Sequence, residues 1–151
     1  MKAAIPKTLH ISSKAAYYDI RIRRSHLHGY GVFAIEDIPR GRRVIEYMGR
    51  RLNREERSRI SPHKDCYLVS MNSRWVIDGS RGGSGAQFIN HSCNPNLEWR
   101  CVRNHLLLFS RRKIRAGEEL TVHYRYPIKL QRVPCRCGAR RCRGTLRFIL
   151  H

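Results

Sequence analysis

The apolar residues of this chain occur in runs that are too short to form long helices. Tyr18, Ile20 and Ile22 alternate with polar or charged neighbours, and residues 97–102 alternate in the same way except at the last position. A period of two is typical of strands with one buried face. Further short apolar runs lie between Gly, Pro, Asn or charged turns, at residues 32–35, 44–47, 67–71, 75–77, 105–109 and 120–124. The pattern predicts a mainly β fold built from many short strands.

The sequence predicts one helix, over residues 54–60. Asn53 can cap its first turn, Glu56 can return the capping-box hydrogen bond, and Pro62 lies beyond its end. A second, shorter helical turn is expected at residues 85–89, where small residues precede Phe88. The Gly/Ser-rich loop at residues 79–85 has the composition of a flexible linker.

Length and charge limit the class of protein. A chain of 151 residues is long enough for one domain and too short for two full-sized cores. It carries 31 Lys and Arg against 11 Asp and Glu, a formal net charge of +20, and the basic residues are spread along the chain. A charge of this size favours an anionic partner such as nucleic acid, although it can also serve only to keep a protein in solution.

The cysteines are more consistent with metal binding than with disulfides. The N-terminus has no apolar stretch of the roughly 7–15 residues that a secretory signal needs, and no run approaches the ~20 residues that cross a bilayer. We therefore expect an intracellular protein, in which six cysteines serve as metal ligands or core thiols.

Three cysteines near the C-terminus form a candidate zinc motif. Cys135, Cys137 and Cys142 fall within eight positions, and zinc is held by four tetrahedral ligands, so the fourth must come from elsewhere. The remaining donors of this type are Cys66, Cys93 and Cys101. The alternative is three unliganded thiols on an arginine-rich segment, which would be exposed to oxidation. Neighbouring arginines favour the thiolate form that metals bind.

Three further segments carry polar or aromatic groups that could form a site. Residues 87–96 place several hydrogen-bonding side chains and a proline after an apolar turn, and Gly29 and Gly31 flank one tyrosine ahead of a strand. Residues 117–126 predict a strand that ends in Tyr124 and Tyr126 on the same face. Each segment also has a plain structural explanation, as an Asx-rich turn, a tight turn and core tyrosines respectively.

Together, and in this order, these segments closely resemble the SET-domain protein lysine methyltransferases that carry a C-terminal post-SET zinc motif. The resemblance runs from Arg21 to Leu146, which is nearly the whole chain. It rests on five motifs, which are Gly29-x-Gly31, Glu46-Tyr47-Met48-Gly49, Asn90-His91-Ser92-Cys93-x-Pro95-Asn96, Gly117-Glu118-Glu119-Leu120-Thr121-x-x-Tyr124 and Cys135-x-Cys137-x4-Cys142.

The resemblance implies a fold and a division of the chain. The fold would be several small β-sheets with one or two short helices, in which residues 90–93 are threaded beneath the C-terminal strand as a pseudo-knot, a rare arrangement. The chain would divide into an N-terminal extension at 1–16, a SET domain at 17–127 and a post-SET zinc motif at 131–147. No cysteine-rich segment precedes Arg21, so the domain itself would select its target.

The resemblance also implies a site. S-adenosylmethionine would be bound by Gly29, Tyr30, Gly31, Tyr67, Asn90, His91 and Leu146, with Phe148 as an alternative to Leu146. The catalytic residues lining the lysine channel would be Tyr124, Tyr47 and Tyr126. One structural zinc ion would be bound by Cys93, Cys135, Cys137 and Cys142. The position two residues before Tyr124, often aromatic in this family, is Val122, so the number of methyl groups added is not predicted; Trp99 could compensate, or be a core residue.

The implied function is methyl transfer from S-adenosylmethionine to a lysine of a basic, DNA-associated protein, such as a histone or a nucleoid protein, with DNA held by the dispersed arginines. The expected location is the nucleus in a eukaryote, the cytoplasm and nucleoid in a bacterium, or the nucleus of a host cell if a bacterium secretes the protein by a non-classical route. The alternative is a catalytically inactive, zinc-stabilised module of the same fold that binds nucleic acid or chromatin.

Overall fold

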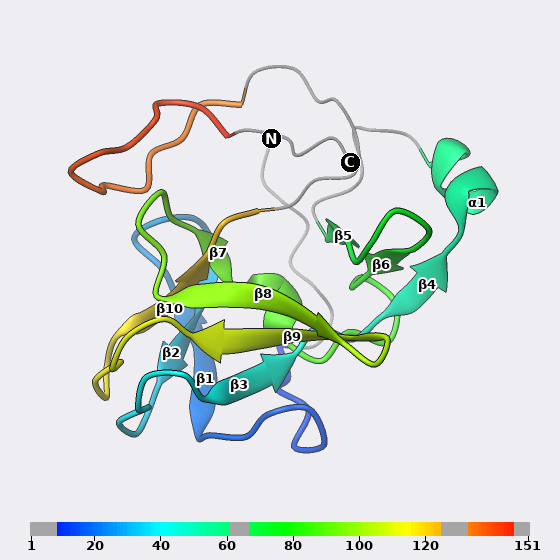
Figure 1. The fold of residues 1–151 in the computed structure, drawn as a ribbon. Helices are drawn as coiled ribbons and strands as arrows, with labels where there is room; N and C mark the ends of the chain where they lie inside the picture. Colours follow the sequence, from blue (N-terminus) through cyan, green and yellow to red (C-terminus); the bar gives the residue numbers. More distant parts are fainter. Residues whose placement is uncertain (1–8, 61–66, 125–132, 147–151) are drawn as a thin grey trace.

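The structure is a computed structural model that describes residues 9–60, 67–124 and 133–146. The strands of the described residues form three small sheets (Figure 1), which confirms the prediction of a mainly β fold. In chain order the elements are β1 (Ile20–Arg24), β2 (Tyr30–Ala34), β3 (Arg43–Glu46), β4 (Arg50–Leu52), α1 (Arg54–Ser58), β5 (Leu68–Ser70), β6 (Val76–Asp78), the 3-10 helix η2 (Ala86–Phe88), β7 (Asn90–His91), β8 (Leu97–Val102), β9 (His105–Ser110) and β10 (Glu119–Val122).

The first sheet brings the motif-bearing segments together. Its strand order is β1-β2-β10-β7, in which β1, β2 and β10 pair antiparallel. The two-residue strand β7 pairs in parallel with β10, with Asn90 opposite Thr121 and His91 opposite Val122. Residues 90–91 therefore lie beside β10, the most C-terminal strand of this sheet, which is the placement that the predicted pseudo-knot requires.

The second sheet, in the order β3-β9-β8, supplies much of the apolar core. Its hairpin β8–β9 turns at Arg103 and Asn104, whose φ values of 46° and 63° are those of the two-residue turn that matches strand twist. One core cluster joins the first two sheets, η2 and two residues of the third sheet, and its members include the fully buried Ile45, Leu97, Leu106, Leu108 and Leu120.

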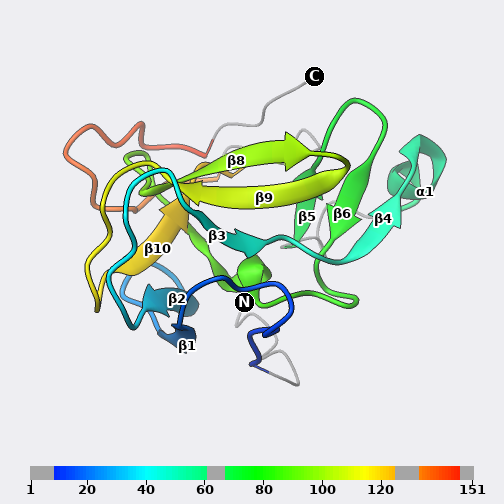
Figure 2. The same ribbon diagram turned by 60° about the horizontal axis from the view of Figure 1, so that its bottom comes forward.

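The third sheet, in the order β4-β6-β5, carries α1 at one side, as Figure 2 also shows. It has a small apolar cluster of its own, made of Leu52, Leu68 and Val76. The predicted capping box of α1 is confirmed, because Asn53 Oδ1 accepts from Glu56 N at 2.9 Å and Glu56 Oε2 accepts from Asn53 N at 3.0 Å. The helix ends at Ser58, two residues earlier than predicted.

The residues before β1 contribute to the same core. Ser12 N donates to Ser84 O at 2.8 Å, Ala15 is fully buried, and Ala15 O accepts from Glu46 N at 3.0 Å. The division of the chain at residues 16, 127 and 131 stays a prediction. None of the helices within the described residues is long and apolar enough to cross a membrane.

Two local expectations differ from the structure. The strand expected to continue through Tyr124 stops at Val122, because His123 O accepts from Trp99 Nε1 and Tyr124 N donates to the His91 ring, so these groups leave the sheet ladder. The Gly/Ser-rich loop is not a free linker, since Ser84 is 1% exposed and its hydroxyl donates to Glu46 O at 2.6 Å.

Candidate active site and zinc site

Asn90 is the buried polar residue at the centre of the candidate site. It is 5% exposed, and its Nδ2 donates to the carbonyl oxygens of Tyr30 at 2.9 Å and His28 at 3.1 Å. Its third contact is Glu119 Oε1 at 2.7 Å, and Glu119 also accepts from Ser25 Oγ at 2.8 Å. Asn90 therefore fixes the loop before β2 against β7 and β10. These hydrogen bonds also avoid the free-energy cost of leaving a buried amide unpaired.

The two glycines of the first motif, Gly29 and Gly31, are required for different structural reasons. Gly29 has a φ of +47°, in the left-handed region that a glycine adopts without strain. At Gly31 a Cβ atom would lie 2.1 Å from Glu119 Oε1, so a side chain would displace the carboxylate that binds Asn90. Between them the ring of Tyr30 lies under the guanidinium of Arg24, 4.5 Å from the ring centre.

His91 connects Asn90 to Tyr124. Its Nδ1 accepts from Tyr124 N at 3.2 Å, and the centres of the two rings are 5.4 Å apart. Its Nε2 lies 3.5 Å from Cys93 Sγ. Burial lowers the pKa of His91 to about 4, with smaller contributions from the nearby charges of His123 and Arg143. The ring is therefore neutral near pH 7, and because Nδ1 accepts a hydrogen bond, its proton is on Nε2.

The second predicted channel tyrosine, Tyr47, lies in the core. It is 3% exposed, and its hydroxyl donates to Tyr67 O at 2.7 Å. Its ring meets the edge of Trp99 with centres 5.7 Å apart, and Trp99 Nε1 donates to His123 O at 2.6 Å. Trp99 is thus a core residue that connects Tyr47 to the backbone next to Tyr124.

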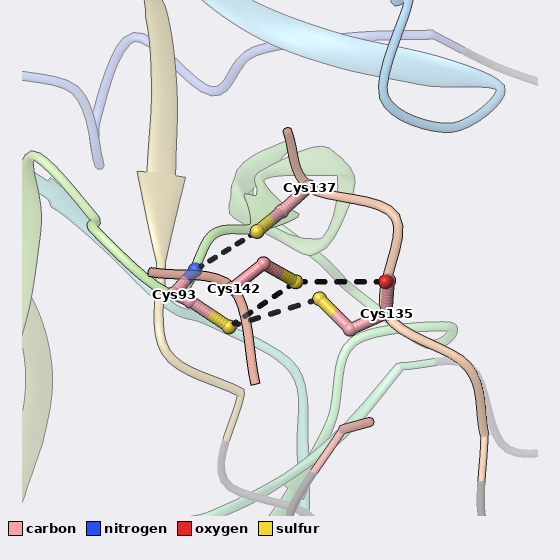
Figure 3. Close-up of side chains that lie close together, drawn as sticks. All are labelled: Cys93, Cys135, Cys137 and Cys142. Carbon is pink, nitrogen blue, oxygen red and sulfur yellow. Dashed lines mark hydrogen bonds between the residues drawn. The ribbon is translucent and has the colours of Figure 1, made fainter. Parts of the chain in front are cut away.

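The predicted zinc ligands converge from two distant parts of the chain (Figure 3). The sulfur atoms of Cys93, Cys135, Cys137 and Cys142 all lie within 4.8 Å of one another. Cys93 Sγ is 3.8 Å from Cys135 Sγ and 4.0 Å from Cys142 Sγ. Tetrahedral zinc with Zn–S bonds of about 2.3 Å requires sulfurs about 3.8 Å apart, so the donor set fits the ion.

The electrostatics of the four cysteines favour a cation among them. Burial raises the pKa of Cys135 to about 12. Burial acts in the same direction on Cys137, but hydrogen bonds from the backbone N–H groups of Cys93 and Ala139 lower its pKa to about 6. Thiolates this close repel one another, so all four ionise together only when a metal ion compensates their charge.

Of the three cysteines that the spacing left open, Cys93 is the one in the cluster. Cys101 is exposed on β8, away from it, and Cys66 lies outside the described residues. Tyr126 and Phe148 also lie outside them. Leu146 is half-buried and its N–H donates to Val133 O at 2.9 Å.

Sequence reasoning missed two residues that organise the site. Glu119 was recognised only as part of a motif, yet its carboxylate bonds Asn90 and Ser25. Arg24 was counted only as a charge, yet it covers Tyr30. The sequence carried no signal for Glu119, because it alternates with the buried Leu120 and Val122, as a solvent-facing residue of a strand does.

Comparison with known proteins gives a consistent result. The family model described as SET domain matches residues 29–125. The chain is 38% identical over 143 residues to histone-lysine N-methyltransferase trithorax of Drosophila virilis, which covers 88% of this chain and 4% of that protein. It is 34% identical over 137 residues to histone-lysine N-methyltransferase SETD1B of Homo sapiens, which covers 84% of this chain and 7% of that protein. The chain thus spans a small part of the curated relatives it matches.

A solved structure agrees with these sequence matches. The crystal structure of KRYPTONITE in complex with mCHG DNA and SAH is similar to this chain with a TM-score of 0.75 and 30% sequence identity, over 87% of this chain and 30% of that chain.

Proposed function

The chain belongs to the SET-domain family, and from this membership we propose that it is an S-adenosylmethionine-dependent protein lysine N-methyltransferase. Two features of the relatives support the proposal. The similar curated proteins are named histone-lysine N-methyltransferases, and the similar solved structure contains SAH, the molecule that remains when S-adenosylmethionine has lost its methyl group.

The observation that carries the proposal is the connection from Asn90 through His91 to Tyr124. Asn90 bonds the carbonyl groups on both sides of Gly29, and the adjacent His91 contacts Tyr124 through its ring and its Nδ1. Two of the residues proposed to bind the cofactor, Asn90 and His91, are therefore linked to the tyrosine proposed to act on the lysine.

The described residues fit S-adenosylmethionine chemically. The carbonyl oxygens of His28 and Tyr30 accept from Asn90 Nδ2, and each has a second lone pair with which it could accept from the cofactor's α-ammonium group. The set proposed to bind the cofactor consists of Gly29, Tyr30, Gly31, Tyr67, Asn90, His91 and Leu146. When bound, the cofactor supplies an electrophilic methyl group on a sulfonium ion.

The tyrosines would prepare the lysine for attack. A free lysine has a pKa of about 10.4, so near pH 7 fewer than about one in a thousand carries the lone pair that attacks a methyl group. The buried rings of Tyr47 and Trp99 exclude water, and desolvation shifts a lysine toward its neutral form. The hydroxyl of Tyr124 would orient the amine for in-line attack. Tyr126, outside the described residues, is proposed to contribute to the same wall.

The zinc ion would have a structural role. Cys93, Cys135, Cys137 and Cys142 would hold it with no position left for water or substrate, which is typical of structural sites. Because Cys93 lies two residues after His91, the ion would fix the C-terminal segment beside the site.

The proposed substrate is a basic, DNA-associated protein such as a histone or a nucleoid protein. A formal net charge of +20 repels a free cationic tail, so the substrate is proposed to arrive bound to DNA. This places the enzyme with chromatin in a eukaryotic cell or with the nucleoid in a bacterial one.

The test is transfer of a labelled methyl group from S-adenosylmethionine to histones or basic DNA-binding proteins, read by mass spectrometry. We expect a mass increase in multiples of one methyl group on lysine, and its loss in the Tyr124→Phe variant. Cofactor binding without transfer to any protein in such mixtures would contradict the proposal and favour an inactive, zinc-stabilised binding module.

A further inference from the structure

We propose that the C-terminal segment, residues 133–146, binds the phosphate backbone of duplex DNA beside the candidate active site. The inference rests on the proposed function, because it says how a DNA-bound substrate would be held near Tyr124. It also replaces the expectation of dispersed DNA contacts with one surface.

The positive charge is least balanced at the C-terminal end of the chain. No Asp or Glu follows Glu119 in the sequence, whereas eight Lys and Arg do. Four of these lie in the C-terminal segment and are exposed, namely Arg136, Arg140, Arg141 and Arg143. If the positive charge served only solubility, we would expect Asp and Glu to be spread along the chain as Lys and Arg are.

These arginines have no carboxylate partner within the part of the chain that the structure describes. The ion pairs there use other cations, namely Arg50, Arg59, Arg100, His105, Arg112 and Lys113. Glu119 is occupied by Ser25 and Asn90. The region of α1 is different, because it contains carboxylates, and Glu55 pairs with Arg59 and Glu56 with Arg50.

The zinc site does not neutralise the segment. A zinc ion with four thiolate ligands has a net negative charge of two, so four arginines leave the segment positive. Arginine also matches the partner, since its planar guanidinium binds phosphate oxygens with two parallel hydrogen bonds.

The segment borders the candidate active site. Arg143 N donates to Cys93 Sγ at 3.5 Å, Cys93 Sγ lies 3.5 Å from His91 Nε2, and His91 packs against Tyr124. A second arginine contacts the loop that contains Cys93, because Arg111, which follows β9, donates from Nη1 to Pro95 O at 3.2 Å. In Figure 1 the segment, drawn in orange to red, lies on the side of β7 and β10, and α1 lies on the opposite side. DNA on this surface would present its bound protein close to Tyr124.

The experiment compares two triple variants in binding to a fluorescent 20-bp duplex over a series of salt concentrations. The test variant is R140Q/R141Q/R143Q, and the control R54Q/R57Q/R74Q removes the same charge from α1 and the loop before β6. We expect the test variant to weaken binding at low salt by at least about tenfold and to lower the salt slope by about two to three, because each phosphate contact contributes about 0.9. The control should change affinity by less than about threefold.

The outcomes separate this inference from the proposed function. Equal losses in both variants, no binding by the parent protein, or equally effective competition by poly-glutamate would overturn the inference. Zinc content, measured for each variant, shows that the sulfur cluster has formed. The DNA-binding assay contains no cofactor and no protein substrate, so its result does not depend on methyl transfer. If DNA binding depends on the C-terminal segment but the methyl-transfer assay shows no product, only the proposed function is contradicted.

Discussion

The sheet-built body of the molecule and the C-terminal segment are held by different forces. The body has antiparallel ladders and fully buried side chains such as Leu106 and Leu108. Residues 133–146 include no buried apolar residue, and the backbone bonds are few, for example Cys135 N to Gly144 O at 2.9 Å. The body is thus stabilised by apolar burial, whereas the segment depends on four sulfur atoms.

The two regions meet at the site. Cys93 belongs to the loop after β7, and its sulfur contacts cysteines of the C-terminal segment. A change that affects one stabilising force should therefore leave the other region largely intact, unless it acts at this junction.

The largest effect is expected from removing the metal site. Cys142→Ser removes one of the four proposed ligands and should reduce bound zinc from the expected one ion per chain to near zero, because a structural site uses all four. Hydrogen exchange should then lose protection at residues 133–146 and keep it in β8 and β9. Cys101→Ser, at an exposed cysteine outside the cluster, is the matched control. Global unfolding of the zinc-free variant would show that the body also depends on the metal.

A substitution in the apolar core tests how far burial stabilises the sheet-built body. Leu108→Ala removes a fully buried side chain from β9 and should lower the free energy of unfolding by about 2–5 kcal/mol. Val133→Ala, at an exposed apolar residue of the C-terminal segment, should change it by less than about 0.5 kcal/mol. Urea denaturation of the zinc-loaded protein measures both. Similar losses in the two variants would mean that the segment is held by burial after all.

Removal of the Tyr124 hydroxyl, close to this junction, should affect catalysis without affecting stability. Tyr124→Phe removes one hydroxyl and should lower kcat about 100- to 1000-fold, as loss of a single catalytic hydrogen-bonding group does, while zinc content and unfolding stay unchanged. Tyr17→Phe is the control, since its hydroxyl accepts an exposed hydrogen bond from Arg43 at 3.0 Å. If transfer to lysine is as fast in Tyr124→Phe as in the parent protein, Tyr124 is not catalytic.

The sequence predicted the body better than the junction, for physical reasons. Strands such as β9 carry an apolar run, and the capping box of α1 is local, so both can be recognised along the chain. Strand β4 was not predicted, because Arg50-Arg51-Leu52 has only one apolar residue. Strand β7 was not predicted, because a strand of two residues shows no hydrophobic period. In the site, spacing alone left Cys66, Cys93 and Cys101 equivalent, since the contact that selects Cys93 joins residues more than forty positions apart. Motif resemblance supplied that long-range choice.

The smallest predicted effect concerns His91, whose two ring nitrogens face the two regions. Nδ1 accepts from Tyr124 N, and Nε2 faces Cys93 Sγ. In His91→Asn the side-chain oxygen can replace Nδ1 but nothing replaces Nε2, and in His91→Gln the amide can replace Nε2 but not Nδ1. Second contacts to a metal ligand typically change affinity 10- to 100-fold, so we expect zinc to dissociate about tenfold faster from His91→Asn.

The matching expectation is that His91→Gln keeps its zinc and lowers kcat, because Tyr124 N loses its acceptor. Zinc release to a chromophoric chelator measures the first effect, and methyl transfer measures the second. His123→Asn is the control, since its ring packs 5.4 Å from that of His91 and its backbone carbonyl, which binds Trp99, is unaffected. If both His91 variants lose zinc and activity in the same proportion, the ring acts only by filling space, and the two regions are not connected through its nitrogens.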